Sequence, residues 1–255
     1  MAGRRRTQEQ RLSLSKAGGR VLGLLAATFL LGTTGTETGL AAAPGKTSHP
    51  AAKAVPLFTS QDAASGELAG WKFFAEDPKA KPGEVWKLGR DGVLTCRGKP
   101  KGYLATEKDY TDFTLRLEWR WPAGKPGSGG VLVRMTGPDK IWPKSLEAQI
   151  NAGDAGDFWG LDGHQLSGPA ERSKTLTNPQ FGKLTNVKKT VAVEKPAGEW
   201  NRYEIVVRGD TVTLTINGRE VNRATGCDCV PGKICLTAEG DEYSFRNVEL
   251  IPTKR

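Results

Sequence analysis

Histidine and cysteine are scarce in this chain of 255 residues, which has two histidines and four cysteines. A zinc site would need CxxC pairs or histidine partners, and the sequence has neither. His49 lies near the N-terminus, so His164 is the only histidine left for the main body, which excludes catalysis by several histidines. The spacing of Asp154, Asp157 and Asp162 does not match a calcium-binding loop. We therefore expect no metal cofactor, with a divalent cation as the weaker alternative.

The chain also lacks an apolar run long enough to span a bilayer, which takes about 20 residues. Its longest apolar run, VLGLLAATFLL at residues 21–31, follows a basic stretch and precedes small residues ending at Ala43. This pattern predicts a secretory signal peptide over residues 1–43 and a flexible linker over 44–56. We expect a bacterial protein exported to the periplasm or beyond the cell, with no stable membrane insertion after cleavage. An uncleaved N-terminal anchor is the alternative.

The charge excess is concentrated in this leader. The chain has 37 basic and 28 acidic residues, a formal net charge of +9. Residues 1–50 hold seven basic and two acidic side chains, or +5, which leaves +4 for the remaining 205 residues. That remainder has no basic run with interleaved aromatic residues, so a nucleic-acid partner is not expected. The sequence does not indicate an oligomeric state.

Export would place the four cysteines in an oxidising compartment, where we expect one structural disulfide. Cys227 and Cys229 are too close in sequence to join without strain. Either of them could pair with Cys235 or with Cys96, and the sequence leaves these options open.

The body of the chain shows period-two alternation, which is typical of strands with one buried face. Apolar and polar residues alternate over residues 113–121 and 211–216, and Asn217-Gly218 then provides a tight hairpin turn. With 32 glycines and 15 prolines between short strands, the pattern predicts one all-β domain over residues 57–252, a jelly-roll sandwich of antiparallel sheets. The longest stretch without clear strands, residues 151–186, is expected to be a functional loop.

One predicted strand carries a line of hydrogen-bonding side chains. In residues 145–151 (SLEAQIN), alternation puts Glu147 and Gln149 on the face opposite the apolar residues. In the neighbouring predicted strand, alternation turns Arg134 away from Val131 and Val133, which would bring it near Glu147. A solvated sheet face with surface ion pairs is the alternative.

Two tryptophans lie in loop-like contexts rich in glycine and proline. Trp142 and Trp159 have flat aromatic faces that could stack on a sugar ring, although a core or loop-anchoring role fits the sequence equally well.

Taken together, these stretches make the sequence resemble the 3-keto-disaccharide hydrolase domain family, which has a concanavalin A-like lectin/glucanase sandwich. The resemblance is carried by DFTLRLEWRW at residues 112–121, SGGVLVR at 128–134 and WPKSLEAQ at 142–149. Further matching stretches are residues 92–98, 102–104, 153–159, 199–201, 212–222, 232–240 and 245–248. The resemblance implies a concanavalin A-like jelly roll and a carbohydrate-active role on an oligosaccharide or glycoside.

The family's chemistry implies specific roles for these side chains. A ketone at C3 of a glycosyl unit acidifies the C2 proton, so the bond at C1 can break by elimination and water can then add. Such a site needs a base, an acid and an electrophile for the enolate oxygen. The candidate catalytic residues are Glu147, Arg134 and Glu239. The candidate substrate-binding residues are Gln149, Trp142, Asp157, Trp159 and His164.

A retaining glycosidase of the laminarinase type would instead show E-x-D-x-x-E on one strand face. Here the corresponding stretch is Glu147-Ala-Gln149-Ile-Asn151, with amides in place of carboxylates. Two hypotheses of different class remain: an enzyme acting on 3-keto-glycosides, and a non-catalytic, lectin-like module that binds carbohydrate in the same groove.

Overall fold

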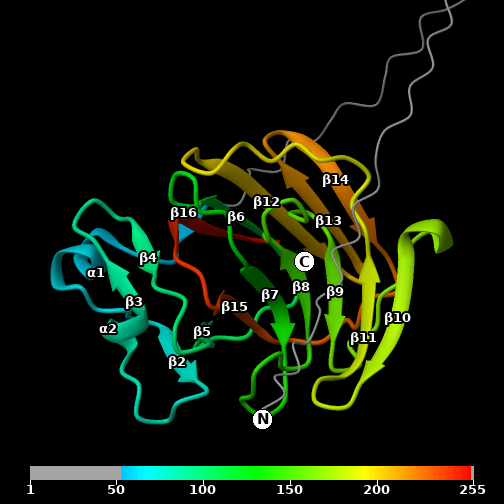
Figure 1. The fold of residues 1–255 in the computed structure, drawn as a ribbon, viewed down its shortest axis with the longest axis horizontal. Coiled ribbons are helices and arrows are strands. Elements are labelled where there is room, and N and C mark those ends of the chain that lie inside the picture. The colour runs from blue at the N-terminus through cyan, green and yellow to red at the C-terminus, as the bar shows by residue number, and fades with distance from the viewer. Residues whose placement is uncertain (1–52, 254–255) are drawn as a thin grey trace, which may run out of the picture. The chain divides into compact units, whose positions relative to one another are not determined.

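Two eight-stranded antiparallel sheets, A and B, pack against each other to form a jelly-roll sandwich (Figure 1). The computed structural model describes residues 53–253. The predicted signal peptide lies outside the described residues, as does most of the predicted linker. Val55–Pro56, within the predicted linker, form strand β1 beside β16.

The strands follow a jelly-roll order. Sheet A runs β14 (Arg219–Ala224), β13 (Thr211–Ile216), β12 (Asn201–Arg208), β6 (Phe113–Arg120), β16 (Tyr243–Pro252), β4 (Leu94–Cys96) and β3 (Trp86–Leu88), with β1 beside β16. Sheet B runs β10 (Ser173–Asn178), β11 (Gly182–Val187), β9 (Phe158–Leu161), β8 (Ser145–Gln149), β7 (Gly130–Met135), β15 (Lys233–Ala238), β5 (Gly102–Thr106) and β2 (Trp71–Ala75). The helices of the described part are α1 (Ser60–Ser65), α2 (Pro82–Val85) and a 3₁₀ turn, η1 (Ala170–Arg172). None of these helices is long and apolar enough to cross a bilayer.

The predicted alternation sets the core between the sheets. In β6, four apolar side chains from Phe113 to Trp119 are buried, and the residues between them are partly or fully exposed. Asn217 and Gly218 join β13 to β14 with φ angles of 51° and 83°, as a primed hairpin turn requires. The all-β sandwich prediction is therefore confirmed.

The stretch predicted as a long loop contains three strands. β9 is short, and the β10–β11 hairpin forms the edge of sheet B at the right of Figure 1. All four central residues of β10 are exposed, so no buried face marked this strand in the sequence.

The predicted disulfide is not supported, because all four cysteines lie within residues 53–253 and all are free. Cys96 and Cys227 belong to the core between the sheets, whereas Cys235 lies in a second apolar cluster on the outer face of sheet B. Cys229 is exposed. Sheet B thus separates Cys235 from Cys96 and Cys227.

Candidate functional site

Two adjoining cavities occupy the outer face of sheet B, the face that points away from the core. Their volumes are about 300 Å³ and 280 Å³. Trp142, Asn151 and Glu239 line both cavities, so the two form one continuous space, called the groove below.

The strand register brings the groove's polar side chains together. On β8, Glu147 and Gln149 point to the outer face, and Glu147 lies opposite Trp159 of β9. On β15, Thr237 points to the same face, and Glu239 follows two residues later at the end of the strand. Strand β7 separates β8 from β15, so Glu147 and Glu239 approach each other across it.

Gly130 of β7 provides the room for this approach. A Cβ atom at residue 130 would lie 2.9 Å from Glu147 Cδ and would overlap Glu147 Oε1. The backbone N–H of Gly130 donates to Thr237 Oγ1 at 2.7 Å, and the Thr237 hydroxyl donates back to the Gly130 carbonyl at 3.2 Å. Glu147 can therefore lie over β7 only because residue 130 has no side chain.

Both carboxyl groups are held in an environment that favours the protonated form. Burial, and then the nearby charge of Glu239, raise the pKa of Glu147 well above its ordinary value. Burial also raises the pKa of Glu239, while the Thr237 hydroxyl and the Lys101 ammonium act in the opposite direction. Glu239 Oε1 is enclosed and has no hydrogen-bond partner among the described residues. Because only Glu239 has groups that favour its charged form, Glu239 ionises before Glu147.

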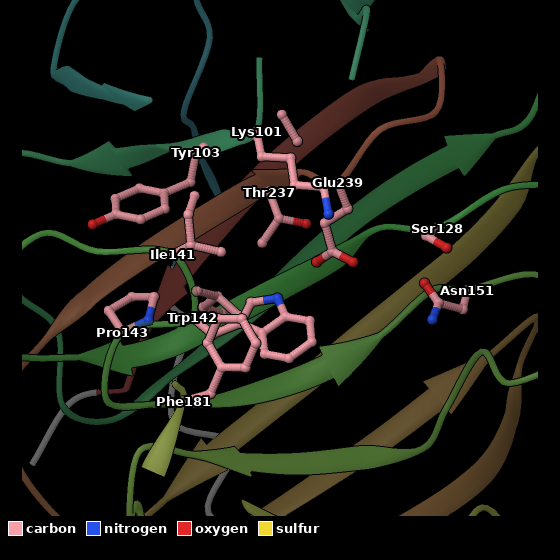
Figure 2. A pocket seen from close by; sticks show the side chains of 13 residues that line it. Lys101, Tyr103, Ser128, Ile141, Trp142, Pro143, Asn151, Phe181, Thr237 and Glu239 are labelled. Atoms are coloured by element: carbon pink, nitrogen blue, oxygen red, sulfur yellow. The ribbon is translucent and has the colours of Figure 1, made fainter. Parts of the chain in front are cut away.

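Lys101 is the one cation that lines the cavity of about 300 Å³, and its side chain extends towards Glu239 (Figure 2). It forms no ion pair within residues 53–253. Where the two cavities meet, the groove thus holds the Glu239 carboxyl group, with Glu147 in one cavity and the Lys101 ammonium in the other.

The backbone fixes the orientation of two groove amides. Gln149 Oε1 accepts hydrogen bonds from the N–H groups of Ile150 and Asn151, each at 3.1 Å. Asn151 Oδ1 accepts from the Gly129 N–H at 2.8 Å. With both oxygens occupied, the NH₂ groups of Gln149 and Asn151 are left to donate to a ligand's hydroxyl oxygens.

Aromatic side chains line the groove. Trp142 has a φ of 55° and packs against Phe181, with ring centroids 4.2 Å apart. Trp159 lies beside Glu147 on the adjacent strand, and the Lys174 ammonium sits 5.4 Å from its ring centroid. Both tryptophans are partly exposed, as a stacking surface requires.

Asp157 also lines the groove, but its carboxylate is engaged by the protein. Its Oδ1 accepts from the Lys189 N–H at 2.9 Å, and the Lys189 ammonium lies 3.7 Å from the same oxygen. Asp157 therefore shapes this end of the groove chiefly by holding the chain after β11.

Arg134 does not lie in the groove, contrary to the strand-parity prediction. Its φ of 53° breaks the alternation at the end of β7, next to a register shift with β15. The fully buried guanidinium donates to the carbonyls of Thr111, Gly209 and Asp228. It also pairs with Asp112 at 3.3 Å. Arg134 thus ties together loops at one end of the sandwich, away from Glu147.

His164 belongs to the same region as Arg134 and lines neither cavity of the groove. Its ring is buried, with Nδ1 3.8 Å from Asp228 Oδ2, and neither ring nitrogen has a hydrogen-bond partner within residues 53–253. Burial lowers its pKa to about 4, against the opposing effect of Asp228. The geometry does not support the predicted substrate-binding role.

Six of the eight predicted site residues therefore meet in the groove. They are Glu147, Glu239, Gln149, Trp142, Asp157 and Trp159. The sequence reasoning missed Lys101, Gly130 and Phe181 as site residues. The Ser128-Gly129-Gly130 stretch was a usable signal, because glycines inside a strand often mark a close approach by another group.

No group of three or more His, Cys, Asp or Glu side chains in the described part of the chain is arranged to hold a metal ion.

The jelly-roll sandwich, whose outer sheet face presents carboxyl groups, oriented amides and tryptophans, belongs to a carbohydrate-active family. Residues 53–251 match the family described as the 3-keto-alpha-glucoside-1,2-lyase-like domain. The chain belongs to this family, so the resemblance drawn from its sequence is confirmed. A search of curated proteins finds no match.

Solved structures share the fold at low sequence identity. A protein of Parabacteroides distasonis ATCC 8503, named "putative glycosyl hydrolase", is 20% identical with a TM-score of 0.54, covering 79% of this chain and 100% of its own. A second protein of that organism with the same name is 16% identical with a TM-score of 0.51, covering 76% and 93%. The beta-glucanase of Bacillus licheniformis is 13% identical with a TM-score of 0.51, covering 80% and 99%.

Proposed function

We propose that this protein cleaves 3-keto-glycosides, 3-keto-disaccharides among them, by elimination at the glycosidic bond followed by addition of water. The observation that carries the proposal is the pair of neighbouring carboxyl groups, the buried Glu147 and the partly exposed Glu239, with the Lys101 ammonium beside Glu239. An elimination of this kind needs a base, an acid and a stabilising positive charge, and these three groups can supply them.

In the first step, the Glu239 carboxylate removes the proton from C2 of the keto sugar. The electron pair of the C–H bond moves into the C2–C3 bond, and the C3 carbonyl becomes an enolate oxygen. Lys101 stabilises that negative charge, the task assigned to Arg134 from the sequence. Glu239 suits the base role because Lys101 and Thr237 favour its ionised form.

In the second step, the enolate reforms the C3 carbonyl, a C1–C2 double bond forms, and the bond from C1 to the leaving oxygen breaks. Glu147, whose raised pKa keeps its proton available, donates that proton to the leaving oxygen. Water then adds across the double bond, with hydroxide at C1 and a proton at C2. The proton returned by Glu239 and the one taken up by Glu147 restore the starting site.

The test incubates the full chain with a methyl 3-keto-glucoside and, separately, with plain methyl glucoside. We expect loss of the keto compound only, with a transient enone absorbance before hydration. Glu147→Gln and Glu239→Gln should each lower kcat/KM by about 100-fold or more. The matched control is Glu67→Gln, since Glu67 is exposed and lies outside the groove. Unchanged turnover in either groove variant would remove that residue from the mechanism.

The second candidate function is a carbohydrate-binding module without turnover. The free NH₂ groups of Gln149 and Asn151 and the partly exposed Trp159 support it, because these groups need no chemistry to hold a sugar. Binding of both methyl glucosides without any loss of the keto compound would favour this module over the enzyme.

We also propose that the protein acts outside the bacterial cytoplasm and needs no metal. The signal-like residues 1–43 support export, and the proposed steps use only side chains of the chain itself. Mass spectrometry of the protein recovered from each cell fraction checks the cleavage. Turnover before and after dialysis against EDTA checks whether a divalent cation is required.

A further inference from the structure

The two ends of the groove differ in chemistry. The end lined by Gln149, Asp157, Asn186 and Lys188 is polar and has free amide donors. The other end is lined mainly by apolar side chains, namely Tyr103, Leu132, Ile141, Trp142, Pro143 and Phe181. Figure 2 shows Ile141, Trp142, Pro143 and Phe181 gathered below Glu239, with Asn151 and Ser128 to one side. Glu239 lies at the border between the two ends.

The two hydroxyl groups deepest in the apolar end are already used. The Tyr103 hydroxyl donates to Asp139 Oδ1 at 2.7 Å, and its ring is buried. The Thr237 hydroxyl exchanges hydrogen bonds with the backbone of Gly130. The groups still able to bond a ligand are the Trp142 indole N–H on the wall and, towards the border with the polar end, Lys101, Ser128, Asn151 and Glu239. The interior of this end therefore offers contact surface and little hydrogen bonding.

Two separate loops build this surface. Trp142 comes from the β7–β8 connection, and Phe181 comes from the turn of the β10–β11 hairpin. The Asn178 side chain holds that turn by accepting from the N–H groups of Gln180 and Phe181, at 2.8 Å and 3.0 Å. The aromatic pair is therefore positioned before any ligand arrives.

A second sugar ring would fit this end less well than a flat aromatic ring. Its hydroxyl groups would lose their water without gaining partners on an apolar wall, which costs free energy for each unpaired group. A flat apolar ring would instead bury its faces against the wall and leave nothing unsatisfied.

We propose that the apolar end of the groove is an aglycone site for a flat aromatic group, so that the preferred substrates are 3-keto-glycosides of phenols. The catalytic part of this statement rests on the proposed function, whereas the binding part does not. The sugar would occupy the polar end, with its C1–O bond beside the two carboxyl groups. On cleavage the C1–O bond breaks, the phenol oxygen keeps the electron pair, and Glu147 supplies its proton.

The binding test uses plain glucosides, which need no turnover. Phenyl glucoside, methyl glucoside and a glucosyl-glucose disaccharide, each as both anomers, are titrated into the full chain and followed by calorimetry. We expect phenyl glucoside to bind at least about tenfold more tightly than methyl glucoside, given the added apolar contact. The disaccharide should gain no such advantage. Equal affinities, or tightest binding of the disaccharide, would overturn the proposal.

Variants test the wall itself. Phe181→Ser and Ile141→Ser should each reduce the ratio of phenyl to methyl affinity by about threefold or more, because each removes apolar contact surface. The matched control is Val230→Ser, which removes an exposed apolar side chain outside the groove and should leave the ratio unchanged. A ratio unaffected by both groove variants would contradict the assignment of the aglycone site.

Turnover of the 3-keto forms separates this proposal from the proposed function. If phenyl 3-keto-glucoside binds more tightly than its methyl counterpart but neither is consumed, the aglycone site is supported and the elimination chemistry is refuted. If both are consumed at equal kcat/KM and bind equally, the elimination chemistry is supported and the aglycone site is refuted.

Discussion

Acid should destabilise the fold through His164, and the size of the effect follows from its surroundings. His164 is buried, and its ring is approached by Asp228, Lys144 and Arg134. Burial, with the two nearby cations, outweighs Asp228 and lowers the His164 pKa from its ordinary 6.5 to about 4. The folded chain therefore binds a proton at His164 only near pH 4, whereas the unfolded chain binds it near pH 6.5.

The sign of the effect follows from this difference in proton binding. Between pH 6.5 and about 4 the unfolded state holds more protons, so the free energy of unfolding falls as the pH falls. The contribution is fully present above pH 6.5. A pKa lowered from 6.5 to about 4 corresponds to about 3 kcal/mol, at about 1.4 kcal/mol for each pH unit.

The perturbation that isolates this effect is His164→Leu, which removes the titrating group and keeps the site apolar. Urea unfolding of the full chain, followed by tryptophan fluorescence at several pH values from 7.5 to 4, gives the free energy of unfolding for each protein. We expect the wild type to lose about 3 kcal/mol more than the variant over this range. Other titrating groups are common to both proteins and cancel in the comparison. Parallel pH dependences would refute the reasoning.

Four further predictions test the groove and the strand ends. Gly130→Ala should lower turnover of a 3-keto-glucoside by about 100-fold in steady-state kinetics, because its Cβ displaces the Glu147 carboxyl. The control is Gly83→Ala, at an open position. Equal rates for Gly130→Ala and the wild type would contradict this account. Glu147→Gln should raise the urea midpoint at pH 7 while turnover falls, since it removes a carboxyl that burial penalises; a lower midpoint would argue against that penalty. Arg134→Ala should lower the free energy of unfolding by about 3 kcal/mol or more, and a smaller loss would mean that its carbonyl partners find other donors. A thiol reagent should modify Cys229 quickly and the three buried cysteines only on unfolding. Fewer than four reactive thiols after unfolding without reductant would instead support the disulfide predicted from the sequence.

The parts of the fold that could be predicted are those determined by local sequence patterns. Alternation in residues 113–121 fixes one buried face of β6, and Asn217-Gly218 fixes the turn after β13. The same parity places Glu147 and Gln149 on one face of β8, whichever strands lie beside it. These features need no knowledge of distant contacts.

The predictions that failed depend on a single backbone angle or on the pairing of strands that lie far apart in the sequence. The residues before Arg134 alternate regularly, but the positive φ of Arg134 turns its guanidinium to the other side of the sheet. No residue type in the sequence predicts that angle. Lys101 reaches the groove because β5 pairs with β15, a strand more than 120 residues later in the chain. Phe181 reaches it because the β10–β11 hairpin folds beside Trp142, and the first strand of that hairpin, β10, has no buried face to predict it.

The groove lowers the stability of the fold. Burial of Glu147 and partial burial of Glu239 penalise their charged forms, and the enclosed Glu239 Oε1 atom has no hydrogen-bond partner in residues 53–253 to offset that penalty. A structural role would be served as well by an apolar or amide side chain at either position. Carboxyl groups with raised pKa values are useful where protons must be moved, and Gly130 keeps the space that lets the two groups meet. The arrangement is therefore better explained by proton transfer than by stability, which favours an enzyme over a module that only binds.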